Sequence, residues 1–182
     1  MAVIYNTAMR PSKLELLSRW LPNQAWYAGS GDELTRAGGF RLDDPDGQVG
    51  IEFMVVLAGD ARAYLVPMTY RGAPLDGAEA ALIGTSEHGV LGARWIYDGE
   101  YDPVSQAQLV ALLRGEVVAQ AQSESHTADP SVRVVPATGP AAVHLRRVLA
   151  ADDPLPRTGG YVTATWRRLD GSLARGIVAT AE

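Results

Sequence analysis

The chain contains no cysteine, and only one of its 16 basic residues, Lys13, is a lysine. The absence of cysteine excludes disulfide bonds, thiol nucleophiles and cysteine-ligated metal sites. No apolar run approaches the roughly 20 residues that a membrane-spanning helix needs. The N-terminal residues also lack a basic segment followed by an apolar one, so no secretory signal is recognisable. We therefore expect a cytoplasmic protein that does not contact membranes.

Positive charge is scarce as well. Lys and Arg number 16 against 21 Asp and Glu, which gives a formal net charge of −5. Sequence-independent binding to nucleic acid needs clustered cations that neutralise phosphates, so we expect no nucleic-acid partner. With 47% hydrophobic residues over 182 positions, the chain can bury a sizeable core and does not have the composition of a disordered protein.

The common signatures of catalysis and metal binding are missing from the sequence. Its three histidines, His88, His126 and His144, lie far apart, and none forms a His-Glu-x-x-His pattern. The sequence has no Gly-x-Ser-x-Gly motif and no glycine-rich phosphate loop. We therefore predict no catalytic residues, no metal site and no cofactor.

The first half of the chain predicts one helix followed by three strands. The helix spans residues 13–21 and ends at Pro22, and the strands span 34–42, 49–57 and 62–71, separated by turn sequences. Pro67 cannot donate a backbone hydrogen bond, so we expect it at a sheet edge or a bulge. Residues 1–10 read as a further short strand. The pattern favours an antiparallel meander that wraps around a helix.

The second half predicts another helix and several strands. Residues 81–99 read as one or two strands that close the first unit near residue 92. Asp102 is a good N-cap, Pro103 suits the first helical position and Gly115 suits the exit. Strands follow at 132–135, 142–149, 161–169 and 173–179. We therefore predict an α+β protein with a first domain over 1–92 and a second, β-rich antiparallel domain over 93–182.

Aromatic and polar residues in two short stretches are the candidates for ligand binding. Aromatic faces beside polar groups are typical of saccharide sites, although core packing is their commoner role, and both interpretations stay open. The candidate ligand-binding residues are Trp26, Tyr27, His88, Trp95, Tyr97 and Asp98. His88, next to Glu87, is the only candidate for a small-molecule catalytic pair, but its turn-like Ser-Glu-His-Gly context favours a structural role.

Three motifs resemble the N-terminal cap domain of maltokinases. They are WLPNQAWYAG at 20–29, ALIGTSEHGVLGARWIYDG at 81–99 and the Asp102-Pro103 helix start, and the likeness is strongest over residues 1–115. Maltokinases phosphorylate maltose with ATP in the bacterial route from trehalose to glucan. The resemblance implies a cystatin-like cap, in which an antiparallel sheet embraces one helix.

Beyond the cap, the sequence resembles a degenerate version of the small kinase lobe. Residues Gln122, Ser123, Glu124 and Ser125 fall where the family has its nucleotide loop, and 143–147 fall where the family has its lysine strand. No lysine follows Lys13, and no His-x-Asp catalytic loop is present. The resemblance therefore implies a non-catalytic binding or regulatory protein of glucan or trehalose metabolism. The alternative is one half of a split sugar kinase that a separate large lobe completes.

Three kinds of partner follow as expectations. The first is a partner enzyme or kinase lobe, and the second is a saccharide. The third is a second copy of the chain, paired through the strand at 173–179. This last expectation assumes that the strand is an uncovered sheet edge, which would invite another chain to pair with it.

Overall fold

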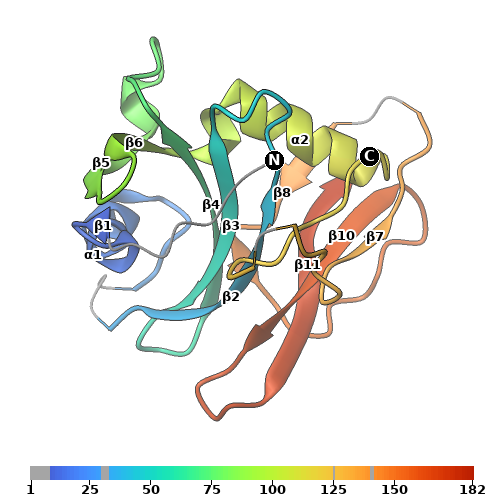
Figure 1. The fold of residues 1–182 in the computed structure, drawn as a ribbon. Coiled ribbons are helices and arrows are strands. Elements are labelled where there is room, and N and C mark those ends of the chain that lie inside the picture. Colours follow the sequence, from blue (N-terminus) through green and yellow to red (C-terminus); the bar gives the residue numbers. More distant parts are fainter. Residues whose placement is uncertain (1–8, 30–32, 125, 140–141) are drawn as a thin grey trace.

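One antiparallel sheet organises the fold of the computed structural model, which describes residues 9–29, 33–124, 126–139 and 142–182 (Figure 1). Its order is β1-β5-β6-β4-β3-β2-β10-β11-β8, with β7 paired to β10 and β9 paired to β4. The strands are β1 (Met9–Arg10), β2 (Thr35–Leu42), β3 (Gly50–Leu57), β4 (Ala63–Arg71), β5 (Leu82–His88), β6 (Gly92–Asp98), β7 (Arg133–Val135), β8 (Val143–Leu145), β9 (Val148–Leu149), β10 (Gly160–Arg167) and β11 (Leu173–Ala181). This is an α+β, β-rich architecture, as predicted.

The first helix, α1 (Lys13–Trp20), lies where the sequence predicted it. Ser12 caps its N-terminus in a capping box with Glu15, so that two otherwise unpaired backbone donors find partners. Pro22 does not stop the chain abruptly, because a 3-10 turn, η1 (Leu21–Asn23), continues from the helix and accommodates it. The apolar stripe of α1 packs against β3, β4, β5 and β6 in a cluster that we call the α1 cluster.

The central strand β3 is buried on both faces, which explains its nearly unbroken apolar sequence. Its Met54 and Val56 enter the α1 cluster, whereas Ile51, Phe53 and Val55 enter a second cluster on the opposite face. We call this second group the α2 cluster, because the helix α2 (Pro103–Leu113) contributes Leu109, Leu112 and Leu113 to it.

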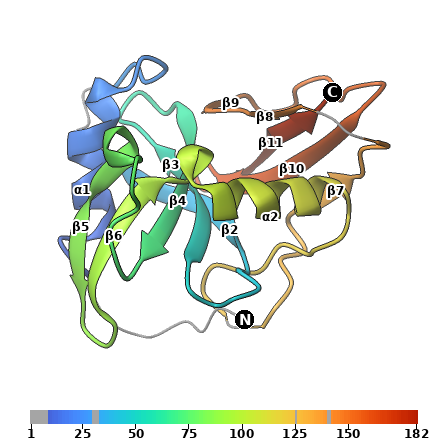
Figure 2. The same cartoon turned by 90° about the horizontal axis from the view of Figure 1, so that it is seen from above.

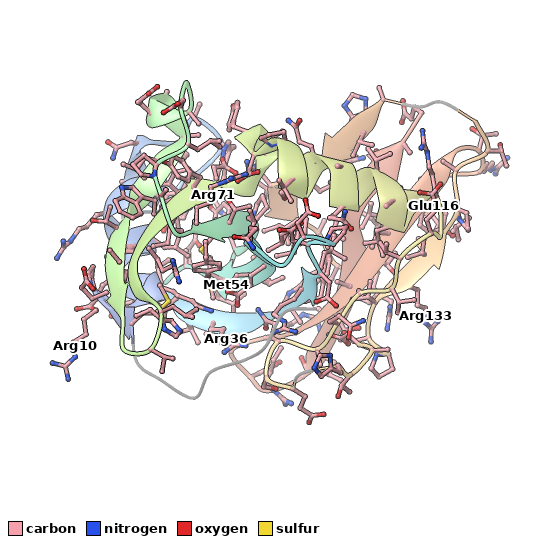
Figure 3. The ribbon with its side chains drawn as sticks, turned by 45° about the horizontal axis from the view of Figure 1, so that its top comes forward. Arg10, Arg36, Met54, Arg71, Glu116 and Arg133 are labelled. Carbon is pink, nitrogen blue, oxygen red and sulfur yellow. The ribbon has the colours of Figure 1, made fainter. Side chains whose placement is uncertain are left out.

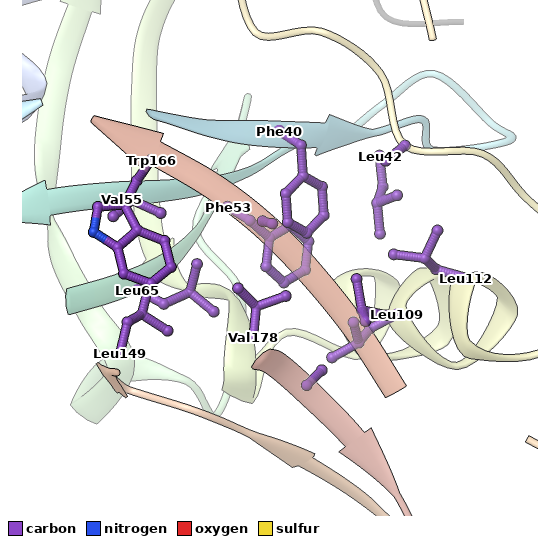
Figure 4. Packing of buried hydrophobic residues seen from close by; sticks show 14 of the residues in the cluster. Phe40, Leu42, Phe53, Val55, Leu65, Leu109, Leu112, Leu149, Trp166 and Val178 are labelled. Carbon is purple, nitrogen blue, oxygen red and sulfur yellow. The ribbon is translucent and has the colours of Figure 1, made fainter. Parts of the chain in front are cut away.

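The α2 cluster joins the meander to the C-terminal hairpin. Phe40 and Phe53 stack with their ring centroids 4.8 Å apart, and Trp166 and Val178 approach from β10 and β11 (Figure 4). The helix α2 lies along one side of the sheet beside β2, β7 and β10 (Figure 2). Its predicted ends are confirmed: Asp102 accepts a hydrogen bond from the backbone N–H of Val104, and Gly115 takes a left-handed φ of +72° just beyond the last turn.

The expected position of Pro67 is wrong. Pro67 lies in β4, a central strand that pairs with β3 along its whole length. On its other side β4 pairs with β9 at 63–64 and with β6 only from Met68 onward, so residues 65–67 face a gap between these two strands. The backbone N–H of Leu65 points into this gap and donates to the carbonyl of Arg147. By strand alternation the nitrogen of Pro67 points the same way, where no ladder bond is lost.

The sheet continues across the predicted boundary between residues 92 and 93. That position lies at the start of β6, which pairs with β5 on one side and β4 on the other. Residues 81–99 therefore form one hairpin, so the predicted division into two domains has no counterpart in a break of the sheet.

The premise of the predicted self-association is also wrong, because β11 is not an open edge. It pairs with β10 along its length and with β8 at 179–181. Its carbonyls at Arg175 and Val178 accept further backbone bonds from Asp152 and Arg146. Ile177 and Val178, offered as available apolar side chains, are buried. The edge position on this side of the sheet belongs to β8.

Two remaining expectations concern the N-terminus and membranes. The strand expected over residues 1–10 lies mostly outside the described residues, of which β1 is the part that can be placed. Among the described helices, none is long and apolar enough to cross a bilayer.

Candidate functional site

Two buried polar clusters stand out against the apolar core, and the first surrounds Glu52 on β3. The Glu52 side chain is only 4% exposed. Its Oε2 accepts a hydrogen bond from Lys13 Nζ at 2.5 Å and another from the hydroxyl of Tyr70 at 2.6 Å. Its Oε1 accepts from the Nε2 of Gln122 at 2.9 Å. We call these four residues and Arg36, which donates from Nη2 to the Oε1 of Gln122 at 2.9 Å, the Glu52 cluster.

Three distant parts of the chain build the Glu52 cluster. Glu52 points toward the α1 side of the sheet, where Lys13 from the first turn of α1 reaches it and also lies 5.2 Å from the centre of the Tyr70 ring. Arg36 lies near the start of β2 and is labelled in Figure 3, with Met54 of β3 labelled above it. Gln122 comes from the segment after α2, which is held to β2 by reciprocal backbone bonds between Arg41 and Gln120.

The donors around Glu52 keep its carboxylate ionised. Burial raises the pKa of Glu52, but the charge of Lys13 and the hydrogen bonds from Lys13 and Tyr70 outweigh it, so the pKa lies below its ordinary value. The same contact acts on Tyr70 in the opposite sense: burial and the neighbouring negative charge hold the pKa of its hydroxyl well above the ordinary range. Tyr70 is therefore a fixed donor and not a proton-transfer group near neutral pH.

The second cluster surrounds Arg147, which lies between β8 and β9. Arg147 Nη2 donates to both carboxylate oxygens of Asp98, at 2.7 and 2.6 Å, and to Oε2 of Glu100 at 2.5 Å, while its Nε donates to the same Glu100 oxygen at 3.0 Å. Its guanidinium carbon lies 5.0 Å from the centre of the Trp26 ring, a cation–π distance. We call these four residues the Arg147 cluster.

The Arg147 cluster ties the second half of the chain to the first. The carbonyl of Arg147 accepts from Leu65 in β4, and its side chain reaches the end of β6 and the loop after α1. The side chains of Asp98 and Arg147 are 3% and 8% exposed, so both charges are removed from water. Burial raises the pKa of Asp98, and this outweighs the opposing effect of the Arg147 charge.

The structure brings together two of the predicted ligand-binding residues, Trp26 and Asp98, through Arg147. Tyr27 instead packs on Tyr64 with a centroid distance of 4.7 Å and belongs to the α1 cluster. Tyr97 is buried on the other face of β6, where its hydroxyl accepts from the backbone N–H of Leu75. Trp95, half-buried, lies on that same face. The six candidates therefore do not line one common site.

His88 has the structural role that its turn context favoured. Its Nδ1 accepts hydrogen bonds from the backbone N–H groups of Val90 and Leu91, which shapes the turn between β5 and β6. Partial burial, with the charges of Arg94 and Lys13, lowers the pKa of His88 below its ordinary value. The imidazole is therefore a neutral acceptor at physiological pH.

The residues expected at the nucleotide-loop position lie in different surroundings. Gln122 is a member of the Glu52 cluster, whereas Ser123 and Glu124 are exposed, and Ser125 lies outside the described residues. The strand expected at 143–147 becomes β8 followed by Arg147, the centre of the other cluster. Within the described residues, no group of three or more acidic or histidine side chains could hold a metal ion.

Glu52, Lys13 and Arg147 are site residues that were not predicted from the sequence. A signal for Glu52 exists, since it is the one charged residue inside the apolar strand 50–57, and an acid there needs a partner. A signal for Lys13 is its uniqueness in the chain. No comparable signal marks Arg147, which is one of many arginines.

Comparison with known protein families finds a match, which lies in the first part of the chain. Residues 20–102, less than half of the chain, match the family model of the maltokinase N-terminal cap domain. The resemblance read from the motifs is confirmed over these residues. A comparison with curated proteins finds no match.

Proposed function

We propose that this chain, whose residues 20–102 match the family model of the maltokinase N-terminal cap domain, is a non-catalytic binding or regulatory protein. It would act in the cytoplasm, in glucan or trehalose metabolism, by docking on a partner enzyme. In this proposal the cap keeps a cystatin-like topology, and the region after it is a small kinase lobe that has lost its nucleotide chemistry.

The observation that carries the proposal is the position of the only lysine. Kinases use a lysine of the small lobe to hold ATP phosphates. In this chain Lys13 is the only lysine, and it forms an ion pair with Glu52 from the first turn of α1 and not from the later strand. At the corresponding position β8 ends at Leu145, and Arg147, which follows it, has its Nε and Nη2 engaged by Asp98 and Glu100. Both cations are thus held in ion pairs with acids of the protein.

The role of Gln122 supports the same conclusion. At the nucleotide-loop position this side chain uses both ends of its amide within the protein, accepting from Arg36 and donating to Glu52. These contacts fasten the segment after α2 to the sheet. A loop that covers ATP needs its polar groups directed at phosphates.

The test is to measure nucleotide binding and phosphoryl transfer with the purified chain. We expect no ATP-dependent phosphorylation of maltose or other sugars, and no binding of Mg-ATP in the micromolar range by titration calorimetry. An intact maltokinase in the same assay is the positive control. Robust phosphorylation by the chain alone, or micromolar Mg-ATP binding, would refute the proposal.

Two further arms separate the alternatives. Phosphorylation that appears only after adding a separately encoded large lobe would favour the split-kinase alternative over a regulatory role. Calorimetric titration with maltose and longer glucans tests whether the chain itself holds a saccharide. If it does, replacing Trp26 with leucine should weaken binding, and the same change at Trp95 serves as the matched control because Trp95 lies apart from the Arg147 cluster.

A further inference from the structure

The side chain of Arg41 on β2 has an unfilled hydrogen-bonding position. Its Nε and Nη2 atoms are buried and have no hydrogen-bond partner among the described residues. The backbone of the same residue is fully paired, since its N–H and C=O bond Gln120 at 2.9 Å each. Buried polar groups nearly always find partners, because leaving one unpaired costs the full desolvation energy of that group. The Nε and Nη2 donors of Arg41 therefore lack the hydrogen-bond acceptor that buried donors normally have.

Arg71 shows which kind of acceptor pairs with these two guanidinium donors elsewhere in the protein. Its Nε and Nη2 donate to the two carboxylate oxygens of Asp102 at 2.7 Å each, near the start of α2 (Figure 3). The same two nitrogens on one edge of a guanidinium match the spacing of two oxygens in a carboxylate or a phosphate. Arg41 presents the same edge, and no acidic side chain among the described residues meets it.

The carboxylate opposite Arg41 on β3, that of Glu52, does not supply that acceptor. Glu52 is directly opposite Arg41 in the register of β2 and β3. Both of its oxygens are engaged by Lys13, Tyr70 and Gln122. Lys13 pairs with this carboxylate, Arg36 bonds Gln122 beside it, and Arg41 lies opposite it in the register. Three cationic residues thus accompany one carboxylate, a local excess of positive charge in a chain of net charge −5. Such an excess attracts a small anion.

We propose that the Nε–Nη2 edge of Arg41 binds one small oxyanion, a phosphate or a carboxylate group. Arg41 as a whole is half-buried, and Arg36 on the same strand is exposed. An ion therefore reaches the guanidinium through shifts of side chains at the surface and not through opening of the sheet. The site is independent of the function proposed above, because a small oxyanion needs neither adenine nor magnesium.

The test uses inorganic phosphate as the probe, with acetate as a second arm and chloride at equal ionic strength as the reference. In the parent protein, phosphate should raise the unfolding temperature above its value in chloride and shift the Nε–Hε signal of Arg41 in a nitrogen–proton NMR spectrum. A response to phosphate alone assigns the site to phosphate groups, and an equal response to acetate assigns it to carboxylates.

Variants of Arg41 decide whether the effect belongs to this side chain. Arg41→Gln should abolish the phosphate response. Arg41→Lys, which keeps the charge but lacks the two-pronged edge, should weaken phosphate binding by about tenfold, the loss expected for one charge-assisted bond. Arg157→Gln, at an exposed loop position, is the matched control and should behave like the parent.

The NMR arm needs only the parent protein, so the result does not depend on the variants folding. An Arg41 signal that responds to neither phosphate nor acetate would overturn the site. A phosphate response in Arg41→Gln equal to that of the parent would overturn it as well. Neither outcome bears on Mg-ATP binding or sugar phosphorylation, which test the proposed function separately.

Discussion

Glu52 and Asp98 are two carboxylates buried to nearly the same degree, with side-chain exposures of 4% and 3%, yet their pKa values shift in opposite directions. Glu52 receives donors from Lys13, Tyr70 and Gln122, which come from three separate elements. Asp98 accepts from the Nη2 of Arg147 and from the backbone N–H of Glu100, but it shares Arg147 with the carboxylate of Glu100, whose negative charge raises the pKa of Asp98 further. Burial alone thus does not decide the direction in which the pKa of an acid shifts. The surrounding charges decide it, because Lys13 and Arg36 both lower the pKa of Glu52, whereas the Glu100 carboxylate opposes the effect of Arg147 on Asp98.

The two clusters also differ in where their cations lie. Lys13 is 35% exposed and retains part of its hydration, whereas Arg147 is 8% exposed and sits against the Trp26 ring. If partly exposed Lys13 is removed, water can replace some of its hydrogen bonds to Glu52. If buried Arg147 is removed, the negative charge of Asp98 stays buried without an opposite charge beside it. The Arg147 cluster should therefore be the more sensitive of the two, and four substitutions test this.

The largest effect is expected from Arg147→Met. Because this change leaves Asp98 buried and unpaired, we expect a loss of about 3–5 kcal/mol in the free energy of unfolding near pH 7. Burial already raises the pKa of Asp98 in the folded protein, and the variant loses the opposing charge. The folded state then takes up a proton at higher pH than the unfolded state, so the variant should regain stability as the pH falls toward the folded pKa.

Urea denaturation at neutral and mildly acidic pH measures both parts of this prediction. Arg146→Met, at the exposed neighbouring position, is the control and should stay within a few tenths of a kcal/mol of the parent. A deficit of Arg147→Met that grows on acidification would contradict the sign worked out for Asp98.

A smaller effect is expected from Glu52→Gln, about 1–3 kcal/mol, because the amide keeps the shape of the side chain but loses charge-assisted bonds. The folded pKa of Glu52 is lowered, so its carboxylate contributes stability above the unfolded pKa, and this contribution is lost as the pH falls through the folded value. In the variant, the free energy of unfolding should therefore lack the part of its pH dependence that comes from Glu52. If the free energy of unfolding changes with pH in the variant as it does in the parent, the pKa of Glu52 is not lowered in the folded protein.

Lys13→Met should cost less still, about 1–2 kcal/mol, because Tyr70 and Gln122 continue to donate to Glu52 and water reaches the rim. Arg19→Met on the exposed face of α1 is the matched control. A loss as large as that of Arg147→Met would reverse the ranking of the two clusters.

The smallest effect is expected from Gln122→Ala, about 1 kcal/mol, since it removes two hydrogen bonds at a half-buried position. Its main result should be local. The amide of Gln120, which bonds the carbonyl of Arg41, should exchange with solvent faster, while amides of β10 keep their protection. Hydrogen exchange that is unchanged at Gln120 would show that Gln122 does not fasten this segment.

Much of the local structure could be predicted because its causes lie within a few residues of one another. The Ser12 cap acts on Glu15, and Asp102, Pro103 and Gly115 mark the two ends of α2. Pro67 shows the limit of such rules. Proline is excluded from a ladder only where a partner strand needs its donor, and the gap between β6 and β9 arises from pairing with residues far along the chain.

The candidate sites were harder to predict because their members are distant in sequence. Lys13 and Glu52 are separated by 39 residues, Asp98 and Arg147 by 49, and Glu52 and Gln122 by 70. The predicted candidates Trp26 and Asp98 do meet, but only through an arginine that no local pattern distinguishes. Chemistry-bearing residue types are visible in a sequence, whereas their pairing is not.

By itself, the sequence determined the helices, most of the strands, the absence of thiol chemistry and the kinship of residues 20–102 with maltokinase caps. Each of these follows from composition, short-range periodicity or a contiguous motif. Only the tertiary structure decided that β11 is covered, that Lys13 is committed to Glu52 and that Arg41 keeps two donors unfilled. The physical reason is that partners of buried backbone edges and charges are set by long-range packing, and that packing brings together residues whose separation along the chain carries no local signal.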